Sequence, residues 1–176
     1  MSNLFLISDT HFGHAKMCDF LRDDGTKVRP FKSAEEQDEY MIEKWNSVVN
    51  KKDQTYHLGD VVIHRRSLEI LSRLNGVKVL IKGNHDIFPP NDYLKYFKDV
   101  RGSHLLHKDY RLTHVPWHTS CVRDGEFNLH GHIHYHTVLG ADGKPDPRYI
   151  NMCVEHWDYT PVPFEQIKKI LAERVV

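Results

Sequence analysis

Residues 77–86 read VKVLIKGNHD, an apolar run followed at once by polar residues that can bind metals. The apolar run over residues 77–81 predicts a short buried strand. Two earlier segments follow the same plan: NLFLIS at 3–8 runs into DTH, and QTYHL at 54–58 runs into GD. Each of these three predicted strands therefore ends in carboxylate, amide or imidazole side chains.

The segments between the three strands predict helices. Residues 33–50 carry apolar side chains at helical spacing after Ser33, an N-cap residue with Glu36 as its capping-box partner. Residues 66–74 place three leucines toward the interior. The alternation of strand and helix predicts βαβ units and a largely parallel sheet.

The second half of the chain predicts an antiparallel sheet added to the first half. Its apolar runs are short and are separated by turn residues, and residues 164–174 predict a closing helix. The expected strands cover residues 105–107, 110–113, 126–130, 137–139 and 149–154.

Composition favours an ordinary globular enzyme or binding protein. The chain has 176 residues with 24 Lys plus Arg against 24 Asp plus Glu, which gives no broad basic surface for duplex nucleic acid. Its three cysteines are widely spaced without a C-x-x-C pair, so no disulfide framework is expected. No apolar run reaches the roughly 20 residues of a membrane span, and no secretory signal is recognisable. We expect a single cytoplasmic domain over residues 1–176, without a cap domain.

Histidine is unusually concentrated in one part of the chain. Eight of the 14 histidines lie between residues 104 and 136, and residues 127–136 read FNLHGHIHYH. In an extended chain, alternate side chains point to one face, which suits either a row of metal ligands or a solvent-exposed strand edge. The stretch by itself leaves both interpretations open.

Binding sites in α/β sheets form at the carboxyl ends of the strands, so the polar residues after the first three strands are expected to converge. Oxygen and nitrogen donors without a thiolate favour Mn²⁺, Fe, Co²⁺ or Zn²⁺. The donors outnumber what one ion with an open position needs, so two ions sharing a carboxylate are expected. The converging residues are Asp9, His11, Asp60, Asn84 and His85.

Five short motifs, taken in order, resemble the calcineurin-like metallophosphoesterases. They are D-x-H at 9–11, G-D at 59–60, G-N-H-D at 83–86, His114, and G-H-x-H at 131–134. The extension DTHFGH at 9–14 is similar to small bacterial and phage members. The resemblance implies an α/β fold in four layers, α-β-β-α, with two mixed sheets flanked by helices.

The resemblance also implies two metal sites that share Asp60. Mn²⁺ is expected first, and Fe, Zn²⁺, Ni²⁺ or Co²⁺ would also suit these ligands. The family pattern gives His130 and His136 no ligand role. The implied ligands are Asp9, His11, Asp60 and His134 for one ion, and Asp60, Asn84, His114 and His132 for the other.

Catalytic roles follow from the same resemblance. A hydroxide bridging the two ions at Asp60 would attack phosphorus, His85 would protonate the leaving group, and Asp86 would orient His85. The stretch Val61–Ile63 after the G-D motif is apolar and supplies no acidic partner for a ligand.

Four residues are expected to contact substrate. Asn84 and His85 belong to the motif after the third strand. His14 either contacts substrate or caps the helix that follows it. Arg29 either holds a phosphate through its planar guanidinium or is a solvated loop residue.

The expected activity is hydrolysis of a phosphodiester, such as a cyclic nucleotide or a small nucleic-acid-derived diester. A general acid at His85 helps most with the poor alkoxide leaving group of a diester. The alternatives are a phosphomonoesterase or nucleotide phosphatase, and a non-catalytic metal-binding scaffold for a protein partner. The expected partner is a small phosphate ester such as a nucleotide, not duplex nucleic acid or a membrane. The sequence leaves the oligomeric state open.

Overall fold

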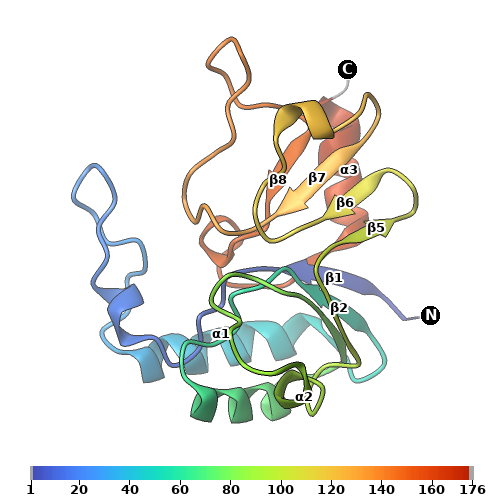
Figure 1. The fold of residues 1–176 in the computed structure, drawn as a ribbon. Helices are drawn as coiled ribbons and strands as arrows, with labels where there is room; N and C mark the ends of the chain where they lie inside the picture. The colour runs from blue at the N-terminus through green and yellow to red at the C-terminus, as the bar shows by residue number, and fades with distance from the viewer. Residues whose placement is uncertain (1, 175–176) are drawn as a thin grey trace.

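The structure is a computed structural model that describes residues 2–174 and contains two β-sheets with helices packed against them (Figure 1). The first sheet has five strands in the order β4-β3-β2-β1-β9. Strands β1 to β4 are parallel, and β9 is antiparallel to β1. The strands are β1 (Leu4–Ile7), β2 (Gln54–His57), β3 (Val77–Ile81), β4 (Asp99–Arg101) and β9 (Val162–Pro163).

The second sheet is mixed, so the expectation of an antiparallel sheet is wrong. β5 is antiparallel to β6, but β6, β7 and β8 are parallel. Parallel neighbours need a connection that returns the chain to the end of the sheet where the previous strand began. The connections over 113–126, from β6 to β7, and over 131–148, from β7 to β8, are long enough for this. Residues 137–139 form no strand, and Leu139 makes only an isolated bridge with Pro145. The strands, in sheet order, are β5 (His104–Leu106), β6 (Tyr110–Leu112), β7 (Phe127–His130) and β8 (Tyr149–Asn151).

The first long helix begins where the sequence predicts. In α1 (Ala34–Val48), the Ser33 hydroxyl accepts a hydrogen bond from Glu36 N at 3.2 Å. The segment expected as an α-helix at 66–74 is instead the 3₁₀ helix η2 (Arg65–Arg73). Three residues per turn align Leu68 with Leu71, and both are buried. The other helices are η1 (Ala15–Cys18), α2 (Pro90–Tyr93), η3 (Thr119–Cys121), η4 (Val154–His156) and α3 (Phe164–Arg174).

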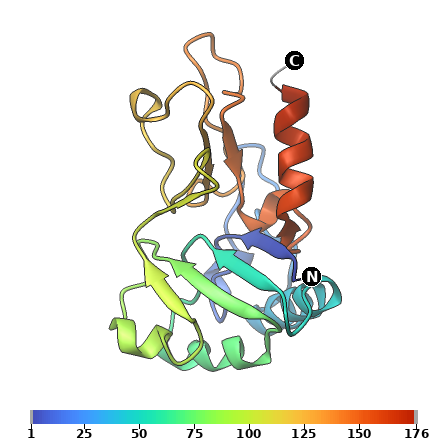
Figure 2. The same ribbon diagram turned by 90° about the vertical axis from the view of Figure 1, so that its right-hand side faces the viewer.

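The core lies on both faces of the first sheet. Figure 2 shows helices beneath this sheet and the second sheet with α3 above it. On one face α1 and η2 bury Trp45, which is 1% exposed and donates from Nε1 to Asn75 O at 3.0 Å. The other face packs against the second sheet and α3 through a cluster that includes Ile81, Leu129 and Phe164. The two mixed sheets and their helices confirm the predicted fold class. Within residues 2–174, no helix has the length and apolar character needed to cross a membrane.

The loop between β6 and β7 covers the remaining face of the second sheet. Trp117 N donates to Asn128 Oδ1 at 2.9 Å, and the Tyr149 hydroxyl donates to Trp117 O at 2.8 Å. The guanidinium carbon of Arg111 lies 4.5 Å from the centre of the Trp117 ring. These contacts fix the loop against the sheet.

Helix α1 supports the loop that follows β1. The carboxylate of Asp38 accepts hydrogen bonds from Gly13 N at 2.9 and 3.1 Å. Asp38 is buried, and burial raises its pKa to about 6. A proton is therefore bound more tightly in the folded chain than in the unfolded chain.

This raised pKa predicts the pH dependence of stability. The stability gained from the proton on Asp38 is complete below pH 4 and is lost as the pH rises toward 6. The side chain of Asp38→Asn stays neutral at every pH. The difference in free energy of unfolding between this variant and the wild type should therefore shift in favour of the variant by on the order of 2–3 kcal/mol as the pH rises from 4 to 6.5. Urea unfolding at each pH measures this gap, with Glu43→Gln on the exposed face of α1 as the control. A gap that narrows with rising pH would contradict the argument.

Candidate metal centre

The loops after β1 and β2 are locked together by backbone hydrogen bonds. Asp9 N donates to Gly59 O at 3.0 Å, and His11 N donates to Asp60 O at 3.0 Å. Both carboxylates are buried, Asp9 at 0% and Asp60 at 2% exposed. Two acidic side chains from neighbouring parallel strands therefore lie inside the protein at one edge of the sheet, as expected.

Left-handed backbone conformations mark the candidate ligands. Nine non-glycine residues of the described chain have positive φ, and five of them are candidate ligands. Such conformations cost about 1–2 kcal/mol each in an L-residue and persist only where surrounding contacts fix them. The five are Asp9 (57°), His11 (48°), Asp60 (56°), His132 (72°) and His134 (47°).

The histidine row at 130–136 is not an extended strand. β7 ends at His130, and His132 and His134 lie in turns with positive φ. The same-face argument from strand spacing is therefore wrong for these two residues. His130 is buried, its Nδ1 lies 2.9 Å from Gly131 O, and burial lowers its pKa to about 4.

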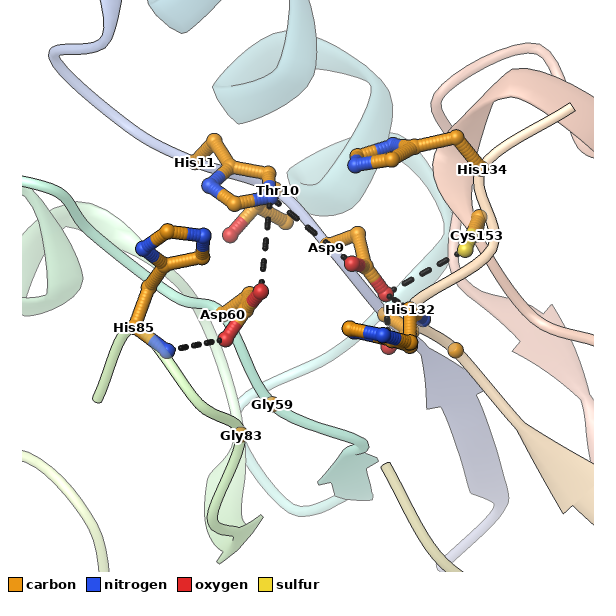
Figure 3. Close-up of polar contacts among 12 residues, drawn as sticks. Asp9, Thr10, His11, Gly59, Asp60, Gly83, His85, His132, His134 and Cys153 are labelled. Carbon is orange, nitrogen blue, oxygen red and sulfur yellow. Dashed lines mark hydrogen bonds and ion pairs between the residues drawn. The ribbon is translucent and has the colours of Figure 1, made fainter. Parts of the chain in front are cut away.

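Potential ligand atoms gather in groups around the two carboxylates. Asp9, His11 and Asp60 offer one set of donor atoms that lie within 4.8 Å of one another. Asp60, His114 and His132 offer a second set within the same limit, so Asp60 belongs to both. Figure 3 shows the imidazoles of His11, His132 and His134 around the carboxylates. The structure thus brings together residues that are up to 125 positions apart, from Asp9 to His134.

Several buried atoms in this centre lack a hydrogen-bond partner in the described chain. They include Asp9 Oδ1 and both ring nitrogens of His11. His11 Nε2 stands 3.7 Å from Asp9 Oδ1 and 3.7 Å from Asp60 Oδ2. Unpartnered buried polar atoms are costly unless something binds them. The spacing and chemistry of these atoms fit a divalent cation.

His114 is oriented toward Asp60. Its Nδ1 lies 2.8 Å from Leu58 O, which leaves Nε2 facing Asp60 Oδ2 at 3.3 Å and Asn84 Oδ1 at 2.8 Å. Burial would lower the pKa of His114, but the contact with Asp60 and the charges of Asp9 and Asp60 raise it to about 9. The site therefore attracts positive charge, which a metal ion provides in exchange for protons.

Glu155 holds His134 in place and was missed in the sequence. Its Oε1 lies 3.1 Å from His134 Nδ1, and its side chain is 1% exposed. A carboxylate behind a histidine fixes the ring that faces a metal. The tetrapeptide CVEH at 153–156 begins two residues after β8 ends, so the strand-end pattern was a signal that could have found this residue.

Arg29 is a structural residue, and its expected phosphate contact is wrong. The side chain is 0% exposed, and its Nε donates to Glu155 Oε1 at 2.8 Å. Nη1 donates to Thr10 O at 2.9 Å and to Gln37 Oε1 at 3.1 Å. Every one of these partners lies within the protein, so the guanidinium cannot reach a substrate. It neutralises Glu155 and supports the loop after β1.

Asp86 also has a different position from the expected one. Its carboxylate accepts hydrogen bonds from Asp60 N at 2.8 Å, Val61 N at 3.0 Å and Gly83 N at 2.8 Å. Both oxygens are used in joining the turns after β2 and β3, so Asp86 does not orient the ring of His85. The side chain of Asp86 is completely buried, and burial raises its pKa.

His85 and His14 lie at the rim of the centre. His85 N donates to Asp60 Oδ1 at 2.8 Å, and the His85 ring centre lies 5.6 Å from that of His11. The His14 ring centre lies 5.7 Å from that of His11 on another side. His14 precedes η1, but its side chain makes no capping hydrogen bond, so it remains a candidate for substrate contact.

Cys153 is a further neighbour that the sequence did not single out. Its Sγ lies 3.2 Å from Asp9 Oδ2, which also accepts from Ser8 Oγ at 2.5 Å and His132 N at 2.9 Å (Figure 3). Burial and the neighbouring acid raise the pKa of this thiol. These three donors fix the Asp9 carboxylate with Oδ1 left free.

At two motif positions, only glycine leaves enough room for the neighbouring carboxylate. A Cβ on Gly83 would stand 2.3 Å from Asp60 Oδ1. A Cβ on Gly131 would stand 2.0 Å from Ser8 Oγ and 2.2 Å from Asp9 Oδ2. The glycines therefore let the loops meet around both carboxylates.

Gly131→Ala should weaken metal binding because the added methyl displaces the Asp9 carboxylate. We expect at least a tenfold loss of Mn²⁺ affinity by isothermal titration, in line with the effect of disturbing residues that orient ligands. Gly102→Ala is the matched control, since nothing lies within 4 Å of its added Cβ. Equal Mn²⁺ affinities in the two variants would show that the close contact between Gly131 and Asp9 does not position the Asp9 carboxylate.

Glu155→Gln should destabilise the metal-free protein because it leaves Arg29 buried without its counter-charge. We expect a loss of about 3–5 kcal/mol in the free energy of unfolding at pH 7. Burial opposes ionisation of Glu155, but Arg29 and His134 lower its pKa to about 2, so this stabilisation is present above pH 4.5 and is lost toward pH 2. Urea titrations measure both effects. The control Glu165→Gln breaks an exposed pair with Lys168 and should change stability little; an equal loss would contradict the account.

Comparison with known proteins places these features in a family. The chain matches the model of the calcineurin-like phosphoesterases over residues 3–170. It is 32% identical over 176 residues to an uncharacterized protein of Methanocaldococcus jannaschii, covering 97% of this chain and 92% of that protein. It is 31% identical over 196 residues to the Gene 66 protein of Mycobacterium phage L5, covering 89% of this chain and 88% of that protein.

A solved structure supports the fold. A protein of unknown function from Aquifex aeolicus superimposes with a TM-score of 0.72 at 26% identity, covering 97% of this chain and 100% of that one. The family match spans the segments that carry all five motifs. The chain belongs to the calcineurin-like phosphoesterase family, whose members are generally metal-dependent phosphoesterases.

Proposed function

We propose that this protein hydrolyses a phosphodiester with the help of two divalent metal ions. The observation that carries the proposal is the position of Asp60, whose carboxylate links one group of potential ligand atoms, with Asp9 and His11, to another, with His114 and His132. One ion would be held by Asp9, His11, Asp60 and His134, and the other by Asp60, Asn84, His114 and His132. The candidate substrates are cyclic nucleotides and small nucleic-acid-derived diesters.

The ligand chemistry favours Mn²⁺, with Fe, Zn²⁺, Ni²⁺ and Co²⁺ as alternatives, because the seven proposed ligands offer only oxygen and imidazole nitrogen. When bound, such an ion pair supplies Lewis acidity toward the phosphate and lowers the pKa of water at the site. Asn84 and the rim histidines would contact the phosphate oxygens. The Glu155 carboxylate contacts Nδ1 of His134, and Leu58 O contacts Nδ1 of His114. Each contact orients the ring so that Nε2 could bind a metal ion.

His85 is proposed as the proton donor to the leaving group. It follows Asn84 directly, is exposed, and has its backbone held by Asp60 Oδ1 at 2.8 Å. This anchoring keeps the imidazole at the rim while the ring stays accessible to substrate. A proton donor helps most when the leaving group is a poor one such as an alkoxide, which favours diesters of nucleosides over activated monoesters.

The proposal predicts metal-dependent hydrolysis of bis-p-nitrophenyl phosphate, tested with metal-stripped protein and Mn²⁺, Ni²⁺, Zn²⁺ or Mg²⁺ in turn. Asp60→Ala should abolish turnover because both ions lose a ligand. His85→Ala should reduce hydrolysis of a dinucleotide by about 10²-fold or more, and that of the p-nitrophenyl ester by less, since p-nitrophenolate leaves without a proton.

The control variant is His107→Ala, which removes an exposed histidine at the turn between β5 and β6. Equal effects of His85→Ala on both substrates would contradict the proton-donor role. Faster hydrolysis of p-nitrophenyl phosphate than of the diester would favour a monoesterase. Two ions bound without turnover of any ester would favour the non-catalytic scaffold.

A further inference from the structure

Two pockets open beside the candidate metal centre, and each is lined by a different pair of proposed ligands. One has a volume of about 600 Å³ and includes His132 and His134 in its lining. The other has a volume of about 620 Å³ and includes Asn84 and His114. Pro116 lines both pockets. A phosphate at the metal centre would therefore have space on either side for a group attached to it.

The pocket beside His132 and His134 is apolar apart from its histidines and Thr137. One wall comes from the excursion of residues 15–28 and the other from residues 132–138, which approach each other at the left of Figure 1. The apolar lining includes Met17, Phe20, Leu21, Val28, Ile133 and Val138. Such a lining suits an apolar group and offers nothing to a second charged one.

Specific contacts hold the two walls together. The Tyr135 hydroxyl donates to Asp23 Oδ1 at 3.4 Å, and the guanidinium carbon of Arg22 lies 5.4 Å from the Tyr135 ring centre. Val28 N donates to Phe20 O at 2.8 Å, and this hydrogen bond joins the two ends of the loop over residues 20–28. The pocket is therefore built into the fold.

The exposed side chains in this pocket are unusual for a protein surface. Phe20 is 47% exposed and Leu21 is 58% exposed, whereas the pocket floor residues Met17 and Val28 are buried. Neighbouring exposed apolar side chains in a concave site indicate a ligand that covers them. The half-exposed ring of Phe20 stands on one wall, whereas the Tyr135 ring on the other wall is contacted by the His136 ring and the Arg22 guanidinium. An exposed aromatic ring favours a planar ligand over an aliphatic chain.

We propose that this pocket is a subsite for a planar aromatic group carried by the phosphate ester, as a nucleobase is in a nucleotide. The inference rests on the proposed function, because the metal centre must hold the phosphate next to His132 and His134. Contact of a ring with the exposed face of Phe20 would then select aromatic esters over small alkyl esters. The protein would thereby recognise a nucleotide through its base without reading the base edges.

The test uses binding, which does not depend on turnover. Phenylphosphonate and methylphosphonate share the anionic group and differ in the ring, and each is titrated calorimetrically into Mn²⁺-loaded protein. We expect phenylphosphonate to bind about tenfold more tightly than methylphosphonate. Phe20→Ala should reduce this preference to below about threefold. Because the Phe20 ring also contacts the His14 ring, the methylphosphonate affinity of the same variant measures any change at the anion site itself.

Leu94→Ala is the matched control, since Leu94 is also 47% exposed but lies after α2 outside the pocket. Equal binding of the two phosphonates to the wild type, or a preference unchanged in Phe20→Ala, would overturn the inference while leaving the phosphoesterase proposal intact. Tighter binding of hexylphosphonate than of phenylphosphonate would also overturn it in favour of an aliphatic ligand. If neither phosphonate binds, the proposed metal-phosphate site itself fails.

Discussion

The structure depends on two carboxylates, Asp9 and Asp60, that are buried together at the ends of neighbouring parallel strands. Two like charges in a low-dielectric interior repel strongly unless positive charge lies between them. The protein surrounds them with imidazoles and leaves Asp9 Oδ1 without a partner in the described chain. The strained turns, the motif glycines and the buried supporting acids all serve to keep this pair in place.

Two further buried acids support the centre from behind. Asp86 gathers three backbone amides and joins the turns after β2 and β3, whereas Glu155 neutralises Arg29 and holds His134. In both cases a buried carboxylate holds neighbouring groups in position. The four acids of the candidate metal centre thus divide into two that lie among the candidate ligands and two that hold the surrounding loops.

The sequence predicted much of this arrangement because strand ends in an α/β sheet converge by geometry. It predicted that Asp9, His11, Asp60, Asn84 and His85 converge at one edge of the sheet, and the structure brings them together there. It was wrong about Arg29 and Asp86, since a side chain's partners depend on long-range packing that local patterns do not contain. It also missed Glu155, whose role requires knowing that η4 lies beside the loop of His134. The parallel pairing of β6, β7 and β8 was missed for a similar reason, because short runs do not reveal strand direction.

The contact between Arg29 and Glu155 joins residues 126 positions apart, near the two ends of the chain. A ribosome releases such a chain from its N-terminus, so every proposed metal ligand emerges before the acid that neutralises Arg29. Until residue 155 is synthesised, the Arg29 guanidinium lacks the carboxylate that neutralises it. One edge of β1 likewise stays unpaired until β9 is made. A complete site therefore requires the segment that follows the last proposed ligand, His134, because Glu155 and β9 both lie in that segment.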